Sequence, residues 1–166
     1  KSHDTKIYKQ RLNLYNFLDI QQKSIKALEV LFQKHFISYE LKNYISNIFS
    51  EFYNKERFKT CICHGDLSNK NIMLKEGKYI VIDWEDAFYG IEGYDLAYWL
   101  TFFDQREYYN SNTLQKYNLY TKKNKYIMIV VVILKCYLSL INNSYKDNTI
   151  SFEKRILEVV NLFKNS

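Results

Sequence analysis

Two short apolar runs, residues 72–74 and 79–82, are separated by only the four residues 75–78, which include Gly77. Short apolar runs on either side of a glycine-containing turn are typical of a β-hairpin. Elsewhere the apolar residues recur mainly at the spacing of helices. Together the two patterns predict an α+β chain that is mostly α-helical and carries one small hairpin.

Helical spacing predicts helices over most of the chain. Residues 5–54 form two or three amphipathic helices, another begins at Tyr94, and the last two span about 123–142 and 151–164. No repeat or linker divides the chain, so residues 1–166 are predicted to form a single domain. The residues of the first helices that are expected to face the core are Ile7, Leu14, Phe17 and Leu18, then Ile25, Leu28, Leu31 and Phe32, then Leu41, Ile45, Ile48 and Phe49.

The stretch 126–141 is apolar enough to raise the question of a membrane span. It covers 16 residues and contains Lys135, whereas a spanning helix needs about 20 uninterrupted apolar residues. We therefore predict a buried central helix here, and no membrane partner.

Composition and charge indicate a globular cytoplasmic protein. With 47% hydrophobic and 25% charged residues, the chain is neither disordered nor fibrous. Its 24 Lys and Arg against 18 Asp and Glu give a net charge of +6, which favours anionic partners such as nucleotides. Three cysteines are an odd number, and the chain has no apolar leader, so a secreted disulfide scaffold is not expected.

One segment carries the residue types that phosphoryl transfer requires. Residues 63–71 read Cys-His-Gly-Asp-Leu-Ser-Asn-Lys-Asn, and Asp83 follows the hairpin. The reaction needs one carboxylate to orient and accept from the attacking hydroxyl, and an amide and a second carboxylate to hold Mg²⁺ against the nucleotide phosphates. Asp66, Asn71 and Asp83 fit these three roles in that order.

The predicted hairpin brings two of these residues together. Pairing centred on the turn sets Asn71 opposite Ile82, so that Asp83 emerges beside Asn71. Opposed residues in a hairpin lie roughly 5 Å apart at Cβ, close enough for an amide oxygen and a carboxylate to share one metal ion. The same register pairs two further couples, Leu74 with Tyr79 and Ile72 with Val81.

These motifs resemble a known family. The residues from His64 to Asn71, with Asp83 and the downstream Tyr94-Asp95-Leu96-Ala97, are similar to the C-terminal lobe of the aminoglycoside phosphotransferase and choline kinase-like family, relatives of the protein kinases. The resemblance implies that Asp66 is catalytic and that Asn71 and Asp83 bind Mg²⁺ and the nucleotide. It makes His64 a structural residue of the catalytic loop and Asp95 a buried brace for that loop at the start of a helix.

The resemblance also implies a reaction. The protein would be an ATP- or GTP-dependent phosphotransferase with an alcohol acceptor. Such an enzyme needs an N-terminal lobe whose strands cover the nucleotide, and nothing upstream of Cys63 reads as such a lobe. The chain by itself is therefore expected to bind nucleotide weakly and to turn over poorly if at all.

Departures from protein kinases favour a small-molecule acceptor. Protein kinases carry Lys two residues after the catalytic Asp and a long proline-containing segment after the metal-binding Asp. Here the first position is Ser68, proline is absent, and 11 residues separate Asp83 from Asp95. Little room remains for a loop that docks a peptide.

Local charge predicts a cationic acceptor, such as an aminoglycoside or choline. Residues 83–107 hold seven acidic residues against Arg106 alone, and focused negative potential concentrates cations. Aromatic faces can hold a quaternary ammonium, although core packing and a solvated acidic loop explain the same residue types. The residues expected to shape the acceptor pocket are Glu85, Asp86, Tyr94, Tyr98 and Trp99.

The same sequence allows three other interpretations, of which two are not favoured. A non-catalytic ligand-binding module derived from a kinase lobe is the main alternative to the enzyme. The Cys61-x-Cys63-His64 pattern lacks the second ligand pair of a structural zinc site, so buried thiols on a strand that leads into the loop are favoured. Lys and Arg do not gather on one motif, so no nucleic-acid partner is expected.

Overall fold

Helix α6 (Lys122–Ile141) is the centre of the helical part of the molecule. Thr121 caps its N-terminus, because the side-chain oxygen of Thr121 accepts the N–H of Asn124 at 3.1 Å. Residues 126–133 and Cys136 are buried, and α6 packs mainly against α2 (Phe17–Gln33), α4 (Tyr94–Phe102) and α7 (Phe152–Leu162). The predicted buried central helix is confirmed.

By length and composition alone, α6 would qualify as a membrane span. The helices packed around it, however, account for its apolar sequence, as expected of a core helix.

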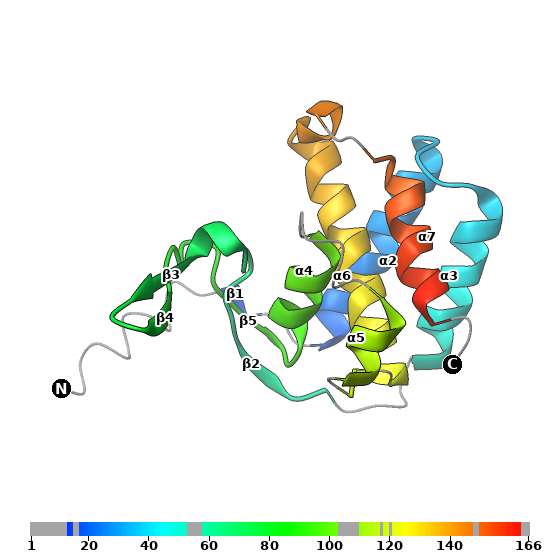
Figure 1. Ribbon diagram of the computed structural model, residues 1–166. Coiled ribbons are helices and arrows are strands. Elements are labelled where there is room, and N and C mark those ends of the chain that lie inside the picture. Colours follow the sequence, from blue (N-terminus) through cyan, green and yellow to red (C-terminus); the bar gives the residue numbers. More distant parts are fainter. Residues whose placement is uncertain are drawn as a thin grey trace.

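The computed structural model describes residues 13–14, 17–52, 58–102, 110–116, 118–119, 121–147 and 150–163. Figure 1 shows the α-helices gathered on one side and the β-strands on the other, with the hairpin of β3 (Ile72–Lys75) and β4 (Lys78–Val81) farthest from the α-helices. Short helices complete the order: α5 (Ser111–Lys116) and the 3₁₀ helices η1 (Asn69–Asn71) and η3 (Ser144–Asp147).

The predicted periodicity is confirmed in α3 (Tyr39–Phe52) and followed in part in α2, where Phe32 is half-buried and the side chains of Phe17 and Leu18 lie outside the described part. In α3 the expected core residues Leu41, Ile45, Ile48 and Phe49 are all buried. In α2 the buried face follows Ile20, Ala27, Leu28 and Leu31, whereas Ile25 is 45% exposed. The prediction for Ile25 was wrong because each helical residue turns about 100°, which places Ile25 just outside the face that meets α6.

A three-stranded sheet links the helices to the hairpin. Its order is β1 (Asn13–Leu14), β5 (Phe88–Ile91), β2 (Thr60–Cys63), with β1 parallel and β2 antiparallel to β5. The assignment of Leu14 to a helix was wrong, because its backbone pairs with Tyr89 of β5. Ile7 lies outside the described residues. Strand β5 has no clear signal in the sequence, and its partners supply the pairing that makes it a strand.

The hairpin has the predicted register. Strands β3 (Ile72–Lys75) and β4 (Lys78–Val81) pair Ile72 with Val81 and Leu74 with Tyr79. The two turn residues, Glu76 and Gly77, have φ angles of +52° and +74°. Positive φ at both positions matches the two-residue turn whose twist suits paired strands. Because two strands alone bury little surface, both faces of this hairpin remain largely exposed.

Helix α7 depends on its N-terminal cap. Ser151 accepts the backbone N–H of Lys154 at 3.2 Å through its side-chain oxygen. We expect Ser151→Ala to lower the free energy of unfolding by about 1 kcal/mol, because one backbone N–H in the first turn of the helix loses its acceptor. Urea unfolding measures this loss. Ser151→Asn keeps a capping oxygen and should stay close to the original stability; equal losses for both variants would contradict the capping role.

Candidate active site

A single carboxylate from α4 holds the loop between β2 and β3. Asp95, in the first turn of α4, accepts the backbone N–H of His64 at 2.8 Å and that of Gly65 at 3.1 Å, one through each oxygen. Two successive peptide groups of the loop are therefore fixed by one side chain. Asp95 lies at the predicted place, the start of a helix, although it is half-buried and not fully buried.

His64 joins this loop to the end of the hairpin. Its ring is buried, Nδ1 accepts the N–H of Asp66 at 3.3 Å, and Nε2 lies 2.8 Å from the carbonyl oxygen of Ile82. Because Nδ1 accepts, the ring proton sits on Nε2 and is donated to Ile82. The ring also packs against Trp84, with 4.9 Å between centroids. His64 thus ties the residue before Asp83 to the loop that carries Asp66.

Asn71 turns its amide toward Asp66. Its buried side chain donates through Nδ2 to the backbone oxygen of Asp66 at 2.8 Å, and Nδ2 lies 3.5 Å from the carboxylate Oδ2. The backbone oxygen of Asn71 accepts the N–H of Ile82 at 2.9 Å, so the predicted pairing of these two residues is confirmed. The amide Oδ1 accepts no hydrogen bond from any residue in the described ranges.

Tyr98 holds the other oxygen of the Asp66 carboxylate. Asp66 is half-buried, and its Oδ1 accepts a short hydrogen bond from the Tyr98 hydroxyl, which reaches it from α4. Burial, and then this hydrogen bond, raise the pKa of Tyr98 far above its ordinary value, so the hydroxyl remains a donor. Among the described residues, Oδ2 has only the long contact with Asn71 and is the freer of the two oxygens.

Asp83 lies two residues beyond the end of β4 and is exposed. Its backbone φ of +62° is left-handed, a conformation that Asp tolerates better than most residues. Within the described part of the chain no residue donates a hydrogen bond to its carboxylate. No three His, Cys, Asp or Glu side chains among the described residues gather into a metal cluster.

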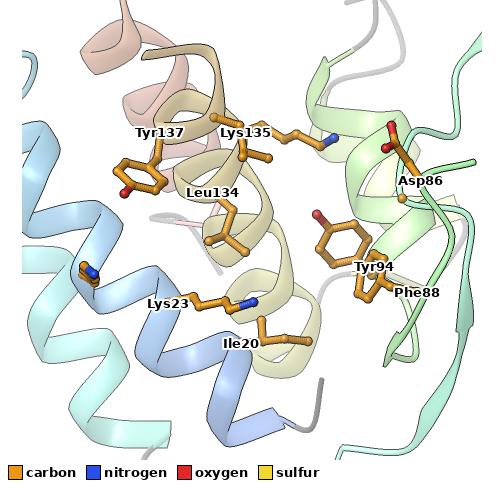
Figure 2. A pocket seen from close by; sticks show the side chains of 11 residues that line it. Ile20, Lys23, Asp86, Phe88, Tyr94, Leu134, Lys135 and Tyr137 are labelled. Carbon is orange, nitrogen blue, oxygen red and sulfur yellow. The ribbon is translucent and has the colours of Figure 1, made fainter. Parts of the chain in front are cut away.

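A cavity of about 470 Å³ opens beside the loop. Gly65 and Asp86 line it on the loop side, Phe88 and Tyr94 from β5 and α4, and other residues from α2 and α6. Figure 2 shows Lys135 extending from α6 toward the side on which Asp86 lies. The cavity therefore lies between helices α2 and α6 on one side and Gly65, the residue before Asp66, on the other.

Of the five residues predicted to shape an acceptor pocket, three lie at the cavity or contact Asp66, and two do not line the cavity. Asp86 and Tyr94 line the cavity, and Tyr98 contacts Asp66. Glu85 is exposed and Trp99 packs half-buried against the core, and neither lines the cavity.

The acidic residues of the predicted stretch 83–107 have different contacts in the structure. Glu92 forms an ion pair with Lys123 at 3.9 Å, and Asp95 holds the loop. Within the described part of the stretch, Asp86 is the acidic residue that lines the cavity. The residues Phe103, Asp104, Arg106 and Glu107 lie outside the described ranges.

Lys135 is a site residue that the motif analysis missed. Its Nζ lies 4.1 Å from the ring centroid of Tyr98, and the side chain lines the cavity. Burial lowers the pKa of Lys135, while the carboxylates of Asp66, Asp86 and Asp95 act in the opposite direction. The signal in the sequence was an isolated lysine within the apolar stretch 126–141, but only the packing of α6 shows what it faces.

Two of the three cysteines lie where a strand leads into the loop, and Cys136 lies on α6. Cys61 and Cys63 belong to β2, with 3.9 Å between their Sγ atoms, and all three cysteines are free. Burial raises the pKa of Cys63, and it raises the pKa of Cys136 to about 12. Both thiols therefore stay protonated at neutral pH, which agrees with the interpretation as packed thiols.

Comparison with known proteins gives one match. A family model described as a phosphotransferase enzyme family matches residues 33–122, more than half of the chain. The matched region contains β2, the loop with Asp66, the hairpin, Asp83 and α4. No curated protein and no solved structure matches the chain.

Proposed function

We propose, from the premise that the chain belongs to the phosphotransferase enzyme family, that it is the catalytic and acceptor-binding lobe of a small-molecule kinase. The reaction moves the γ-phosphoryl group of ATP or GTP to a hydroxyl of the acceptor. One observation carries the proposal: the Asp66 carboxylate is fixed by Tyr98 on one oxygen and Asn71 near the other, next to the cavity that Gly65 and Asp86 line.

Asp66 is proposed as the catalytic carboxylate. The acceptor oxygen attacks the γ-phosphorus, its proton passes to Asp66, and the nucleoside diphosphate leaves. Oδ1 is occupied by the Tyr98 hydroxyl, so Oδ2 is the oxygen that would take the proton. The bonds from Asp95 to the loop and from His64 to Ile82 support a rigid setting for this carboxylate.

Asn71 and Asp83 are proposed to hold Mg²⁺ and, through it, the nucleotide. Mg²⁺ prefers oxygen ligands and usually binds through one or two protein groups together with substrate phosphates. The residues fit this chemistry, because the amide Oδ1 of Asn71 and the carboxylate of Asp83 accept no hydrogen bond from the described residues. When bound, the ion would neutralise charge on the nucleotide phosphates.

An N-terminal lobe is proposed to cover the hairpin in the full-length protein. Leu74 is 65% and Tyr79 80% exposed, and Met73 and Ile80 are also exposed. Leu74 pairs with Tyr79 and Met73 pairs with Ile80, so successive pairs lie on opposite faces and both faces of the hairpin carry exposed apolar side chains. Exposed apolar surface of this kind usually marks a contact with another element. A lobe laid over these strands would also enclose the nucleotide beside Asp83.

The acidic stretch and the cavity favour acceptors of opposite charge. The acidic stretch predicts a cationic acceptor such as an aminoglycoside or choline. The cavity does not favour a cationic acceptor, because three lysines and one carboxylate line it.

The test uses the full-length gene product, ATP or GTP, and a titration of Mg²⁺. We expect nucleotide consumption that requires Mg²⁺, and Asp83→Asn should raise the Mg²⁺ concentration at half-maximal rate by at least about tenfold. Glu51→Gln, which alters an exposed carboxylate on α3, is the control and should leave that concentration unchanged.

Two results would overturn the enzyme. Ligand binding by the full-length protein without any response to Mg²⁺ and nucleotide would favour the non-catalytic module. Full activity of Asp83→Asn with an unchanged Mg²⁺ requirement would remove Asp83 from the metal site.

A further inference from the structure

Within the described ranges, no group of opposite charge lies within bonding distance of the Lys135 ammonium group. The ammonium group lies over the face of the Tyr98 ring, at 4.1 Å from Nζ to the centroid. Among the described residues none forms an ion pair with it or accepts its hydrogen bonds. A cation over an aromatic face gains some attraction, but its three donors remain unused.

A largely buried charge without hydrogen-bond partners destabilises a fold. An apolar side chain of similar length would fill this position on α6 without that cost. Lys135 is instead turned into the cavity (Figure 2), where a ligand could reach its donors. A lysine at position 135 is therefore better explained by binding of a ligand than by packing alone.

The rest of the cavity narrows the kind of ligand. Lys23 and Lys26 line it from α2, so cationic side chains come from two separate helices. Asp86 lies on the loop side, next to the residue that precedes Asp66. The remaining lining is largely apolar: Ile20, Phe88, Tyr94, Leu134, Tyr137 and Leu138. Such a cavity suits a molecule with an apolar body and a negative group.

We infer that the acceptor of this enzyme carries a carboxylate or phosphate group as well as its hydroxyl and an apolar body, and that Lys135 binds that anionic group. The inference deepens the proposed function, on which it rests for the statement that the bound molecule is the acceptor. Its hydroxyl would lie toward Asp66, since Lys135 contacts the ring whose hydroxyl bonds Asp66.

Binding to the full-length protein, measured by calorimetry without nucleotide, tests the inference. Three probes share one skeleton and differ in charge: 3-phenyllactate is anionic, 3-phenyllactamide is neutral and phenylalaninol is cationic. A charge-assisted hydrogen bond should make 3-phenyllactate bind about tenfold more tightly than the other two. Glycerol 3-phosphate against glycerol forms a second arm, which shows whether phosphate serves better than carboxylate.

Substitutions separate binding from packing. Lys135→Met should reduce the affinity for the anionic probes by about tenfold and leave that for 3-phenyllactamide unchanged, whereas Lys135→Arg should keep the preference. The melting temperature of Lys135→Met should not fall, because the variant removes an unpaired charge. Lys122→Met, at an exposed position on the same helix, is the control and should alter neither quantity.

Each remaining outcome overturns the inference. Tighter binding of phenylalaninol, equal binding of the three charge forms, no saturable binding of either anion, or a preference that survives Lys135→Met would do so. Failure of the full-length product to transfer phosphate is a separate result, which would remove the proposed reaction and leave the anion preference measured without nucleotide.

Discussion

Asp66→Asn is expected to lower kcat of the proposed full-length kinase by about a thousandfold, within the range for loss of a general base. The amide cannot accept the proton of the attacking hydroxyl. It can still accept from the Tyr98 hydroxyl, so the local fold should persist. Nucleotide affinity should therefore change little.

Steady-state kinetics and equilibrium nucleotide binding on the same preparations check this result. Glu51→Gln removes an exposed carboxylate from α3 and should keep full kcat. An Asp66→Asn enzyme within a few-fold of the original rate would show that another group takes the proton. Equal loss of nucleotide binding and of kcat would show that Asp66 acts on the nucleotide and not on the acceptor.

Gly65→Ala is expected to lower the free energy of unfolding by about 3 kcal/mol and to abolish transfer. Gly65 has a φ of +85°, and a Cβ atom there would lie 2.4 Å from the backbone oxygen of Asp86. The left-handed backbone costs about 1–2 kcal/mol for a non-glycine residue, and crowding a packed site costs about 1–3 kcal/mol more. The loop and the segment after Asp83 would have to separate.

Gly77→Ala is the matched control for this change. Gly77 has a similar φ of +74°, but a Cβ atom there would meet nothing within 4 Å. It should cost about 1–2 kcal/mol, the backbone share alone. Urea unfolding of the two variants isolates the contact between Gly65 and Asp86. Equal losses would show that the loop does not need that close approach.

Local patterns predicted much of the fold. The hairpin register follows from a two-residue turn between short apolar runs, and the observed pairing of Ile72 with Val81 agrees with it. The core face of α3 follows from spacing along one helix, and the burial of α6 follows from its continuous apolar stretch. The family follows from the spacing between Asp66, Asn71 and Asp83, which a family model over residues 33–122 confirms.

Non-local contacts were beyond the same reasoning. Leu14 pairs with Tyr89 although helical periodicity covers it, and β5 forms because two other strands flank it. The hydrogen bond from Tyr98 to Asp66 joins residues 32 positions apart. Lys135, from α6, faces the same site because α6 packs against α2 and α4.

The sequence by itself determined the helices, the hairpin and the order of the chemical groups, because periods of two and 3.6 residues and a two-residue turn are settled by neighbouring residues. Only the tertiary structure decided which oxygen of Asp66 is occupied and which charges line the cavity. Those features depend on how helix faces pack against one another, and the energy of that packing comes from residues distant along the chain.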